Sequence, residues 1–594
     1  METADRSWRR GEGAREAGRA GEAATAYRRT LALVPDFAPA HANLALVLPA
    51  TGATRVAEAE IRRAIALIPD HPLLCFNLGN LLEAAGRAGA GGAFRRSLAL
   101  DPAQAAAWLN LGVAVQGEGR LAKAEAAAGR ALALSPLYAE AWNNLANARR
   151  DQGRIRDALL AYGRALALRP GYADADRNRL AARLYLDDDD EIAGREAAFF
   201  VRRHGPRQAV LPATTEIDPE RPLRLGFLSS DLGDHPVGRN MAGFIRHRDR
   251  GLIGLAVYDS GRRSEAESAW FRARADLWRD VAPLDDRAIA EIIRSDRIDV
   301  LVGLAGRFDR NRPLVAAWRA APVQLAMHDG GPSGMGEGAT GAGDDPAIDA
   351  WITDAVLHPS GAASGDRAGG DRLVRLPVFY NFQKPDRPPP VRRPDPDIVF
   401  GSFSNPAKLS PPLLAAWGRI LARLPEARLQ LKYRACYGDP AVQARVRAAI
   451  AAAGGNPARL VFLAAAEDAE SHLQRYGGID LALDPFPFSG ATTSFEALAM
   501  GVPVLTFAGH AAIGRTTAAI LEPLGLDELV AVSEEDYVAR ALRLASDRSR
   551  LGALRDEIPG RLQRSSLLDG EAYAAALSSA FRRLWRDWCR KAGA

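Results

Sequence analysis

The chain has 594 residues, 47% of them hydrophobic and 25% charged, a balance typical of globular proteins and not of long disordered regions. Its formal charge of +5 is spread along amphipathic helices without interleaved aromatic residues, so nucleic acid is not an expected partner. Three scattered cysteines cannot build a disulfide framework or a zinc site. The polar first residues, and the lack of any run of about 18 apolar residues, argue against export and membrane insertion, so we expect a cytoplasmic protein.

A proline recurs at the end of similar apolar helical segments in the first third of the chain. The spacing is 34, 33, 34 and 34 residues, the tetratricopeptide period, for Pro35, Pro69, Pro102, Pro136 and Pro170. Each proline ends one helix and lets the next begin. Residues 1–186 are therefore predicted to form a solenoid of about five helical hairpins.

One asparagine per repeat falls at the same phase, at Asn43, Asn77, Asn110, Asn144 and Asn178. Because one helix position per repeat projects to one face of a superhelix, these amides are predicted to line the concave surface. Amides there could bind the backbone of an extended peptide. In the alternative interpretation each amide only bonds the neighbouring repeat, and the sequence leaves both open.

Two α/β segments are predicted to follow the repeats. Residues 187–221 are a linker and helix, whose acidic run lacks accompanying ligand residues and is interpreted as solvated, so no metal site is expected. Short apolar runs then alternate with helical stretches over 222–385 and again over 396–565, the pattern of parallel sheets covered by helices. We expect two Rossmann-like lobes with a ligand cleft at the carboxyl ends of the strands, and a final helix at 566–594.

The clearest local signal lies in residues 479–509. A buried strand ends at Asp484, a loop rich in proline, glycine and serine follows, and Thr492 and Thr493 open a helix. The amides at a helix start form an anion site suited to a diphosphate, and Glu496, one turn later, could accept hydrogen bonds from ribose hydroxyls. The alternative is a capping box of Thr493 and Glu496, which binds no ligand.

Six segments of the sequence are similar to those of a known protein family. They are LRLGFLSSDLGDHPVGRNM (223–241), RAAPVQ (319–324), IDAWITD (348–354), DRLVRLP (371–377), FGSFSNPAKLSP (400–411) and the segment 479–509. In this order, behind tetratricopeptide repeats, they resemble the protein O-GlcNAc transferase and SPINDLY-type family of GT-B glycosyltransferases, and bacterial members most closely. The resemblance implies an α-helical tetratricopeptide solenoid followed by an α/β GT-B fold, a nucleotide-sugar donor, and no cofactor or metal.

The resemblance also implies roles for individual residues. Lys408 matches the lysine that meets the diphosphate, and His235 matches the histidine beside the sugar and the acceptor hydroxyl, so both are the candidate catalytic residues. Further nucleotide-sugar contacts are expected from Asn405, Lys432, His472 and Arg515, together with Thr492, Thr493 and Glu496. Lysine is rare here, with five among 77 basic residues, and a lysine with a helix start can neutralise a departing diphosphate without metal. The alternatives are a surface ion pair for either lysine and helix packing for His472.

Several segments depart from the family pattern. Residues 306–308 read Gly-Arg-Phe where relatives tend to have Gly-His-Thr, and residues 327–336 replace a Trp-Leu-Gly-Tyr-Pro-Gly-Thr stretch. Ala491 and Ala512 stand where the family commonly has threonine or histidine. All these changes fall where the acceptor and sugar pockets are expected.

Three hypotheses follow. The first is an inverting glycosyltransferase that moves N-acetylglucosamine from UDP-GlcNAc to serine or threonine of a protein held by the repeats. The second keeps the reaction class with GDP-fucose, as in SPINDLY-type members, or a hexose nucleotide. The third is an adaptor that has lost turnover. The acceptor's identity, the general base and the oligomeric state stay open.

Overall fold

The computed structural model describes residues 3–186, 190–206, 217–261, 265–306, 308, 310–328, 347–359, 372–383 and 397–593. The chain forms two compact units, the first made of Met1–Arg149 with Gly163–Pro170 and the second of Arg150–Tyr162 with Gly171–Ala594. Most of the acidic run, Arg307, nearly all of the departing segment 327–336 and the proline-rich linker between the expected lobes lie outside the described residues.

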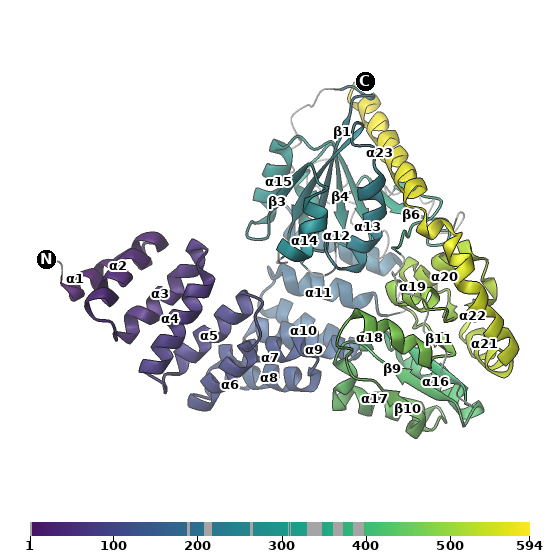
Figure 1. Ribbon diagram of the computed structural model, residues 1–594, viewed down its shortest axis with the longest axis horizontal. Coiled ribbons are helices and arrows are strands. Elements are labelled where there is room, and N and C mark those ends of the chain that lie inside the picture. The colour runs from purple at the N-terminus through teal and green to yellow at the C-terminus, as the bar shows by residue number, and fades with distance from the viewer. Residues whose placement is uncertain are drawn as a thin grey trace. The chain divides into compact units, whose positions relative to one another are not determined.

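The first unit is built from consecutive antiparallel helices, as the 34-residue period predicts (Figure 1). They are α1 (Ala4–Glu16), α2 (Ala20–Leu33), α3 (Ala38–Val47), α4 (Thr54–Leu67), α5 (Pro72–Ala84), α6 (Ala90–Leu100), α7 (Ala105–Gly117) and α8 (Leu121–Leu134). The next two helices, α9 (Ala139–Asp151) and α10 (Ile155–Leu168), are divided between the two units. A side chain at Gly79 of α5 would overlap the ring of Phe94 in α6, so a glycine is required where these helices approach closely. The prediction of a tetratricopeptide-like region is confirmed.

Two helices lead from the repeats into the α/β part of the second unit. They are α11 (Ala173–Arg183) and α12 (Asp190–His204). Leu180 of α11 and Phe200 of α12 share one buried cluster with Trp351 of the following sheet. Asp176 of α11 is fully buried and accepts a hydrogen bond from Nε2 of His204 in α12 at 3.0 Å. The last repeat helix and the linker helix are therefore packed as part of the second unit.

The first lobe contains a seven-stranded parallel sheet of order β3-β2-β1-β4-β5-β6-β7. Its strands are β1 (Leu223–Ser229), β2 (Ile253–Asp259), β3 (Leu277–Asp280), β4 (Val300–Leu304), β5 (Val323–Met327), β6 (Ala350–Thr353) and β7 (Arg372–Arg375), with helices α13 (Pro236–His247), α14 (Glu265–Arg272) and α15 (Asp286–Ser295). In register, Leu225 of β1 lies opposite Val300 of β4. The inner strands β4, β5 and β6 are almost entirely buried, as in parallel sheets that helices cover on both faces.

The second lobe repeats this arrangement with a six-stranded parallel sheet of order β10-β9-β8-β11-β12-β13. Its elements are β8 (Val399–Ser402), α16 (Pro411–Arg423), β9 (Arg428–Leu431), α17 (Pro440–Ala452), β10 (Leu460–Phe462), α18 (Ala469–Gln474), β11 (Leu481–Leu483), α19 (Thr492–Ala499), β12 (Val504–Phe507), α20 (Thr516–Leu521), β13 (Val530–Ala531), α21 (Glu534–Ser546) and α22 (Arg548–Gln563). In each sheet the strand order reverses beside the first strand, at β1/β4 and at β8/β11. Such switch points are where open α/β sheets bind ligands. The two predicted Rossmann-like lobes are confirmed.

The final helix, α23 (Gly570–Ala592), returns to the first lobe and runs alongside α13 (Figure 1). Phe581 and Trp585 are fully buried in the same cluster as Phe227 of β1 and Phe244 of α13. Trp585 also donates a hydrogen bond from Nε1 to the carbonyl oxygen of Asp218 at 2.9 Å. The end of the chain thus belongs to the core of the first lobe, although the second lobe precedes it in sequence.

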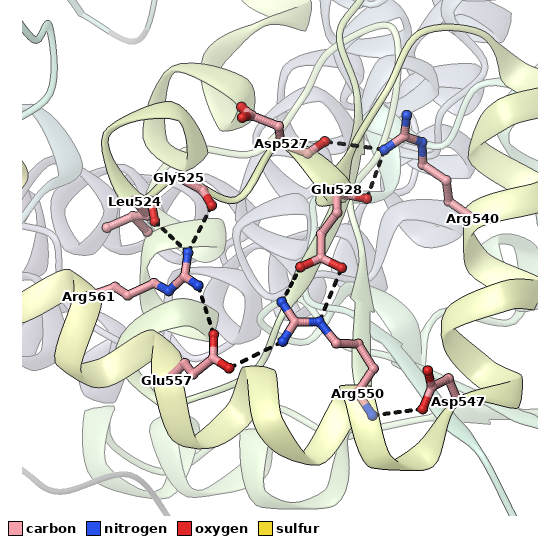
Figure 2. A network of polar contacts seen from close by, with 9 residues as sticks. All are labelled: Leu524, Gly525, Asp527, Glu528, Arg540, Asp547, Arg550, Glu557 and Arg561. Atoms are coloured by element: carbon pink, nitrogen blue, oxygen red, sulfur yellow. Dashed lines mark hydrogen bonds and ion pairs between the residues drawn. The ribbon is translucent and has the colours of Figure 1, made fainter.

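A network of charged side chains ties α22 to the loop before β13 (Figure 2). Arg550 bonds both Glu528 and Glu557, the latter at 3.2 Å. Glu557 in turn accepts from Arg561 at 2.8 Å, and Arg561 reaches the carbonyl oxygen of Gly525 at 2.8 Å. Arg561 thereby provides a hydrogen-bond partner for a backbone carbonyl group of the short loop.

Replacing Arg550 by alanine is expected to lower the free energy of unfolding of the second unit by about 1 kcal/mol, because a network is removed but its side chains are about one-third exposed. Calorimetry at low salt and at about 1 M salt checks this, since salt screens exposed charges and should shrink the loss. Arg9→Ala, which removes a more exposed pair with Asp5 in α1, is the matched control and should change little. An equal effect at both salt concentrations would contradict an electrostatic origin.

Candidate active site

A cavity of about 460 Å³ lies in the second unit where segments that follow the strands of both sheets meet. Its volume is in the range of small-molecule sites in proteins. The first lobe contributes segments after β1, β4, β5 and β6, and the second lobe contributes segments after β8, β11 and β12. Residues of the repeat helices complete the wall, namely Arg150, Asp151, Asn178, Ala181 and Tyr185. The cavity therefore sits at both switch points.

The cavity brings together about half of the predicted site residues. Lining it are His235, Asn405, Lys408, Thr492 and Thr493, together with Asn178 of the asparagine series. Four other predicted nucleotide-sugar contacts are not among the described residues that line it, namely Lys432, His472, Glu496 and Arg515. Arg515 instead donates a hydrogen bond to the carbonyl oxygen of His510 at 2.5 Å.

Lys408 is held on the cavity wall by the loop that follows β11. Its Nζ donates a hydrogen bond to the carbonyl oxygen of Ser489 at 2.7 Å and lies 4.2 Å from the centre of the Phe488 ring. Burial lowers the pKa of Lys408 to about 8, and the carboxylate of Asp484 opposes this shift. The ammonium group is therefore still the main form near neutral pH, beside a cavity that could hold an anion.

Asn405 presents Lys408 through a short turn. Its side-chain oxygen accepts a hydrogen bond from the backbone amide of Ala407 at 3.0 Å and caps the 3₁₀ turn Pro406–Lys408. The asparagine thus has a local structural task in addition to its place on the cavity wall. Sequence reasoning predicted a ligand contact here but not the cap.

Asp484 organises the loop between β11 and α19. Its carboxylate accepts hydrogen bonds from the amide of Gly490 at 2.8 Å, from Ser494 Oγ at 3.2 Å and from Thr506 Oγ1 at 2.7 Å. Burial raises the pKa of Asp484, and these hydrogen bonds oppose the rise. Sequence reasoning did not identify Asp484 as a positioning residue, although an acidic residue ending the apolar run IDLALD was the available signal.

Helix α19 begins at Thr492 without a side-chain cap. Ala491 is the N-cap residue and makes no capping hydrogen bond, so the alternative of a capping box between Thr493 and Glu496 is wrong. The first amides of an α-helix have no partner within the helix. Since Thr492 and Thr493 line the cavity, the amide-rich end of α19 is directed at the same region as Lys408.

Glu496 joins a chain of charged and polar groups instead of lining the cavity. One oxygen accepts from His472 Nε2 at 3.0 Å, and the other lies 3.4 Å from Arg239 of α13 in the first lobe. His472 Nδ1 lies 2.5 Å from Nζ of Lys432, which is 5% exposed and whose pKa burial lowers. The three predicted contacts Lys432, His472 and Glu496 are therefore brought together with one another, and an arginine of the other lobe completes the chain.

His235 stands at the amino end of α13, directly after the switch-point strand β1. Its Nδ1 accepts from the amide of Val237 at 3.4 Å, which makes the imidazole the N-cap of the helix. The carboxylate of Asp231, at 3.9 Å from the same nitrogen, is beyond hydrogen-bond distance. A neutral imidazole that accepts through Nδ1 carries its proton on Nε2, so this arrangement leaves Nε2 as a donor.

Two further histidines line the cavity and were not predicted. Burial lowers the pKa of His328 to about 3 and that of His358 to about 4, so both are neutral at physiological pH. His358 shares a hydrogen bond of 2.6 Å with Thr353 Oγ1. His328 is the second residue of the segment 327–336, whose departure from the expected pattern was the available signal.

The five asparagines of the series do not share one kind of contact. Nδ2 of Asn43 donates to Glu12 and Nδ2 of Asn110 donates to Asn80, each at 2.7 Å and each to the preceding hairpin, so these two amides bond the neighbouring repeat, as the alternative interpretation proposed. Asn77 makes no such side-chain bond to a described residue. Asn144 accepts a hydrogen bond from Asn143 of its own helix at 3.3 Å, and Asn178 lines the cavity. The sequence phase alone did not separate these roles.

Alanine variants of Asn43 and Asn77 distinguish a structural role of these amides from a role in binding an acceptor. Asn43→Ala is expected to lower the unfolding midpoint of the repeats, since it leaves Glu12 without one of its donors, whereas Asn77→Ala should leave the midpoint unchanged. If the series binds acceptor, Asn77→Ala should raise the KM for a protein acceptor severalfold. Calorimetry and acceptor titrations check both, and a lower midpoint for Asn77→Ala would contradict this division.

The described residues contain neither a metal-binding cluster nor a membrane-spanning helix. In the described part of the chain, no group of three or more histidine, cysteine, aspartate or glutamate side chains is arranged to hold a metal ion. Over the same residues, no helix combines the length and the apolar character that crossing a bilayer requires.

Two Rossmann-like lobes whose switch-point loops share one cavity are the arrangement of the GT-B fold. The sequence profile of glycosyl transferase family 41 matches residues 390–577, and that of the tetratricopeptide repeat matches residues 139–172. A solved O-GlcNAc transferase mutant from Thermobaculum terrenum is 33% identical, with a TM-score of 0.80 over 88% of this chain and 98% of that one. The chain belongs to the O-GlcNAc transferase and SPINDLY-type family, glycosyltransferase family 41.

Curated relatives agree with this assignment. The probable UDP-N-acetylglucosamine–peptide N-acetylglucosaminyltransferase SPINDLY of Oryza sativa subsp. japonica is 32% identical over 429 residues, 70% of this chain and 44% of the relative. The probable enzyme of the same kind named SEC, from Arabidopsis thaliana, is 28% identical over 385 residues, 62% of this chain and 37% of the relative. The chain spans less than half the length of these curated relatives.

Proposed function

We propose that the protein transfers N-acetylglucosamine from UDP-GlcNAc to a serine or threonine hydroxyl of a protein, with inversion and without a metal. The observation that carries this proposal is the single cavity lined by Lys408, the start of α19 and His235. The names of the relatives, which specify UDP-N-acetylglucosamine and peptide, support the donor and the kind of acceptor.

The reaction is a single displacement. The acceptor oxygen forms a bond to the anomeric carbon on the face opposite the nucleotide, the bond from that carbon to the diphosphate oxygen breaks, and the hydroxyl proton passes to a base. Negative charge grows on the diphosphate as it leaves. The Lys408 ammonium and the free amides of α19 are positioned to stabilise that charge in place of a metal ion.

His235 has the chemistry of an orienting donor in this scheme. Because Nδ1 is engaged by the amide of Val237, the proton on Nε2 can be donated to an oxygen of the sugar or of the acceptor. An imidazole in this state holds the reacting group in place and does not itself accept the acceptor's proton. The base is thus another group, and it is not assigned to His235.

Two replacements of His235 distinguish its proposed role as an orienting donor from its structural role as the N-cap of α13. His235→Asn keeps an N-cap acceptor for α13 and should leave the unfolding midpoint near that of the wild type, while His235→Ala should lower it. Both should lower kcat by roughly 10²-fold if the imidazole contributes its expected share of catalysis. Initial rates with saturating donor and thermal unfolding check this, and full activity of the asparagine variant would contradict a chemical role.

The acceptor is proposed to reach the cavity past the last repeat helix. Asn178 and Tyr185 belong to this part of the chain and line the cavity, and the Tyr185 ring stacks on Phe488 at 4.8 Å with an interplanar angle of 24°. The same loop holds Lys408 through Ser489. An acceptor bound along these residues would therefore contact the loop that stabilises the leaving group.

A thermal-shift panel of UDP, GDP, UDP-GlcNAc, UDP-glucose and GDP-fucose tests the proposal, because a ligand that binds the folded state raises its unfolding midpoint. We expect the uridine ligands to stabilise the protein, with EDTA present, and UDP-GlcNAc to support transfer to a protein acceptor by mass spectrometry. A preference for guanosine ligands would replace the donor by GDP-fucose. No shift with any nucleotide would overturn the enzymatic proposal in favour of an adaptor.

A further inference from the structure

His328 occupies an unusual position at the carboxyl end of β5. Its backbone φ is +61°, in the left-handed region that side chains other than glycine adopt rarely. Its Nε2 atom is buried and has no hydrogen-bond partner among the described residues. The ring lies against Phe379 and Tyr380, with ring centres 4.7 Å and 6.2 Å apart. A buried polar atom without a partner is uncommon, and at a cavity it points to a ligand.

The neighbouring strand ends in the same way. Ala305, directly after β4, has φ of +56° and donates its amide to the carbonyl oxygen of Met327 at 2.8 Å. Ala305 and His328 both line the cavity. Left-handed non-glycine residues are strained, and such residues gather at ligand sites. The two adjacent strand ends are therefore turned to shape the cavity wall that carries the His328 ring.

This wall is neutral and partly aromatic, in contrast to the wall that carries Lys408. His328 and His358 are both uncharged near pH 7 because they are buried. The rings of Phe379, Tyr380 and Phe382 also line the cavity there. A neutral imidazole offers no charge to a diphosphate, whereas it can exchange one hydrogen bond with a hydroxyl or an amide. Aromatic rings beside it suit the apolar face of a sugar.

His328 also shares the cavity with the reacting centre that is proposed above. The imidazoles of His235 and His328 both line this cavity. In the proposed function His235 donates a hydrogen bond to an oxygen of the sugar or of the acceptor. The group next to that oxygen is the sugar of the donor, so the sugar is the ligand that His328 faces.

We propose that His328 determines specificity for the donor's sugar, with Nε2 hydrogen-bonded to an uncharged hydroxyl or acetamido group of that sugar. The inference rests on the proposed function and adds a specificity-determining residue to it. It separates recognition into two walls: the nucleotide diphosphate is bound by Lys408 and α19, and the sugar by the neutral wall.

The test compares binding of UDP and of UDP-GlcNAc to His328→Phe, which keeps a ring but loses Nε2, by isothermal titration calorimetry of the full chain. We expect UDP to bind within twofold of the wild type and UDP-GlcNAc to bind about tenfold more weakly, the effect of one lost hydrogen bond. His328→Asn should recover part of the loss, and His71→Phe, at an exposed histidine of the repeats, should change neither affinity.

Two results would overturn the inference while leaving the proposed function intact. In one, His328→Phe binds both ligands as the wild type does; in the other, it loses UDP and UDP-GlcNAc affinity by the same factor. If the wild type prefers guanosine, GDP and GDP-fucose take the place of the uridine pair with the same expectations. A wild-type protein that binds none of the four ligands would overturn the proposed function and this inference together.

Discussion

Lys408→Ala should lower kcat by roughly 10²- to 10³-fold, the loss expected when one preorganised group that stabilises charge in the transition state is removed. Lys408 is held over Phe488 and bonded to Ser489, so its ammonium needs little rearrangement to meet a leaving diphosphate. Initial rates under saturating UDP-GlcNAc check the effect. Lys408→Arg should not restore the rate, because the larger planar guanidinium cannot occupy the same enclosed position.

The reaction should also depend on pH through this lysine. Burial lowers the pKa of Lys408 to about 8, so in the free protein the ammonium is present below that pH and is lost as the pH rises through it. We therefore expect kcat/KM to fall above about pH 8 in the wild type and this limb to vanish in Lys408→Ala. Lys123→Ala, at an exposed lysine of α8, should keep both the rate and the pH profile. A wild-type profile that is flat to pH 9.5 would contradict this account of Lys408.

Asp484→Ala should lower the free energy of unfolding of the second unit more than Arg550→Ala does. The substitution leaves the Gly490 amide and the hydroxyls of Ser494 and Thr506 without their buried acceptor, and each buried unsatisfied group costs about 1–3 kcal/mol. We expect the free energy of unfolding of the second unit to fall by at least about 3 kcal/mol. Nucleotide binding should weaken as well, because the same loop carries the carbonyl group that holds Lys408.

A graded variant distinguishes this explanation from general disruption. Thr506→Val removes a single donor to Asp484 and keeps the shape of the side chain, so it should cost about one-third as much and should leave nucleotide affinity nearly intact. Chemical denaturation and UDP titration of both variants check the series. Equal losses for the two variants would show that the carboxylate does not act through several partners.

The overall architecture was predictable because short-range sequence patterns indicate it. The 34-residue period identifies the helical hairpins, and apolar runs such as DVLVGLAG predict strands that helices cover on both faces. The candidate residues His235 and Lys408 came from the family resemblance, and both line the cavity. Their places agree with the rule that ligands meet the carboxyl ends of strands beside a switch point.

Side-chain direction was less predictable, because it depends on partners that are distant in the sequence. Glu496 was expected to bind ribose or to form a cap, and it instead meets His472 and Arg239, the latter 257 positions away. Asp484 acts through Thr506 on the next strand. His328 and His358 line the cavity and were not predicted. In each case the decisive information is a tertiary contact, which neither periodicity nor a local motif contains.

The share of the cavity wall supplied by Arg150, Asn178 and Tyr185 has a consequence for how such chains can vary. These residues belong to the unit that contains both lobes, while the hairpins before them form a separate unit. Evolution or protein engineering can therefore lengthen or shorten the preceding array without removing residues of the cavity wall. A shortened chain would have to keep the last repeat, because cutting just before β1 would remove Arg150, Asn178 and Tyr185 from that wall.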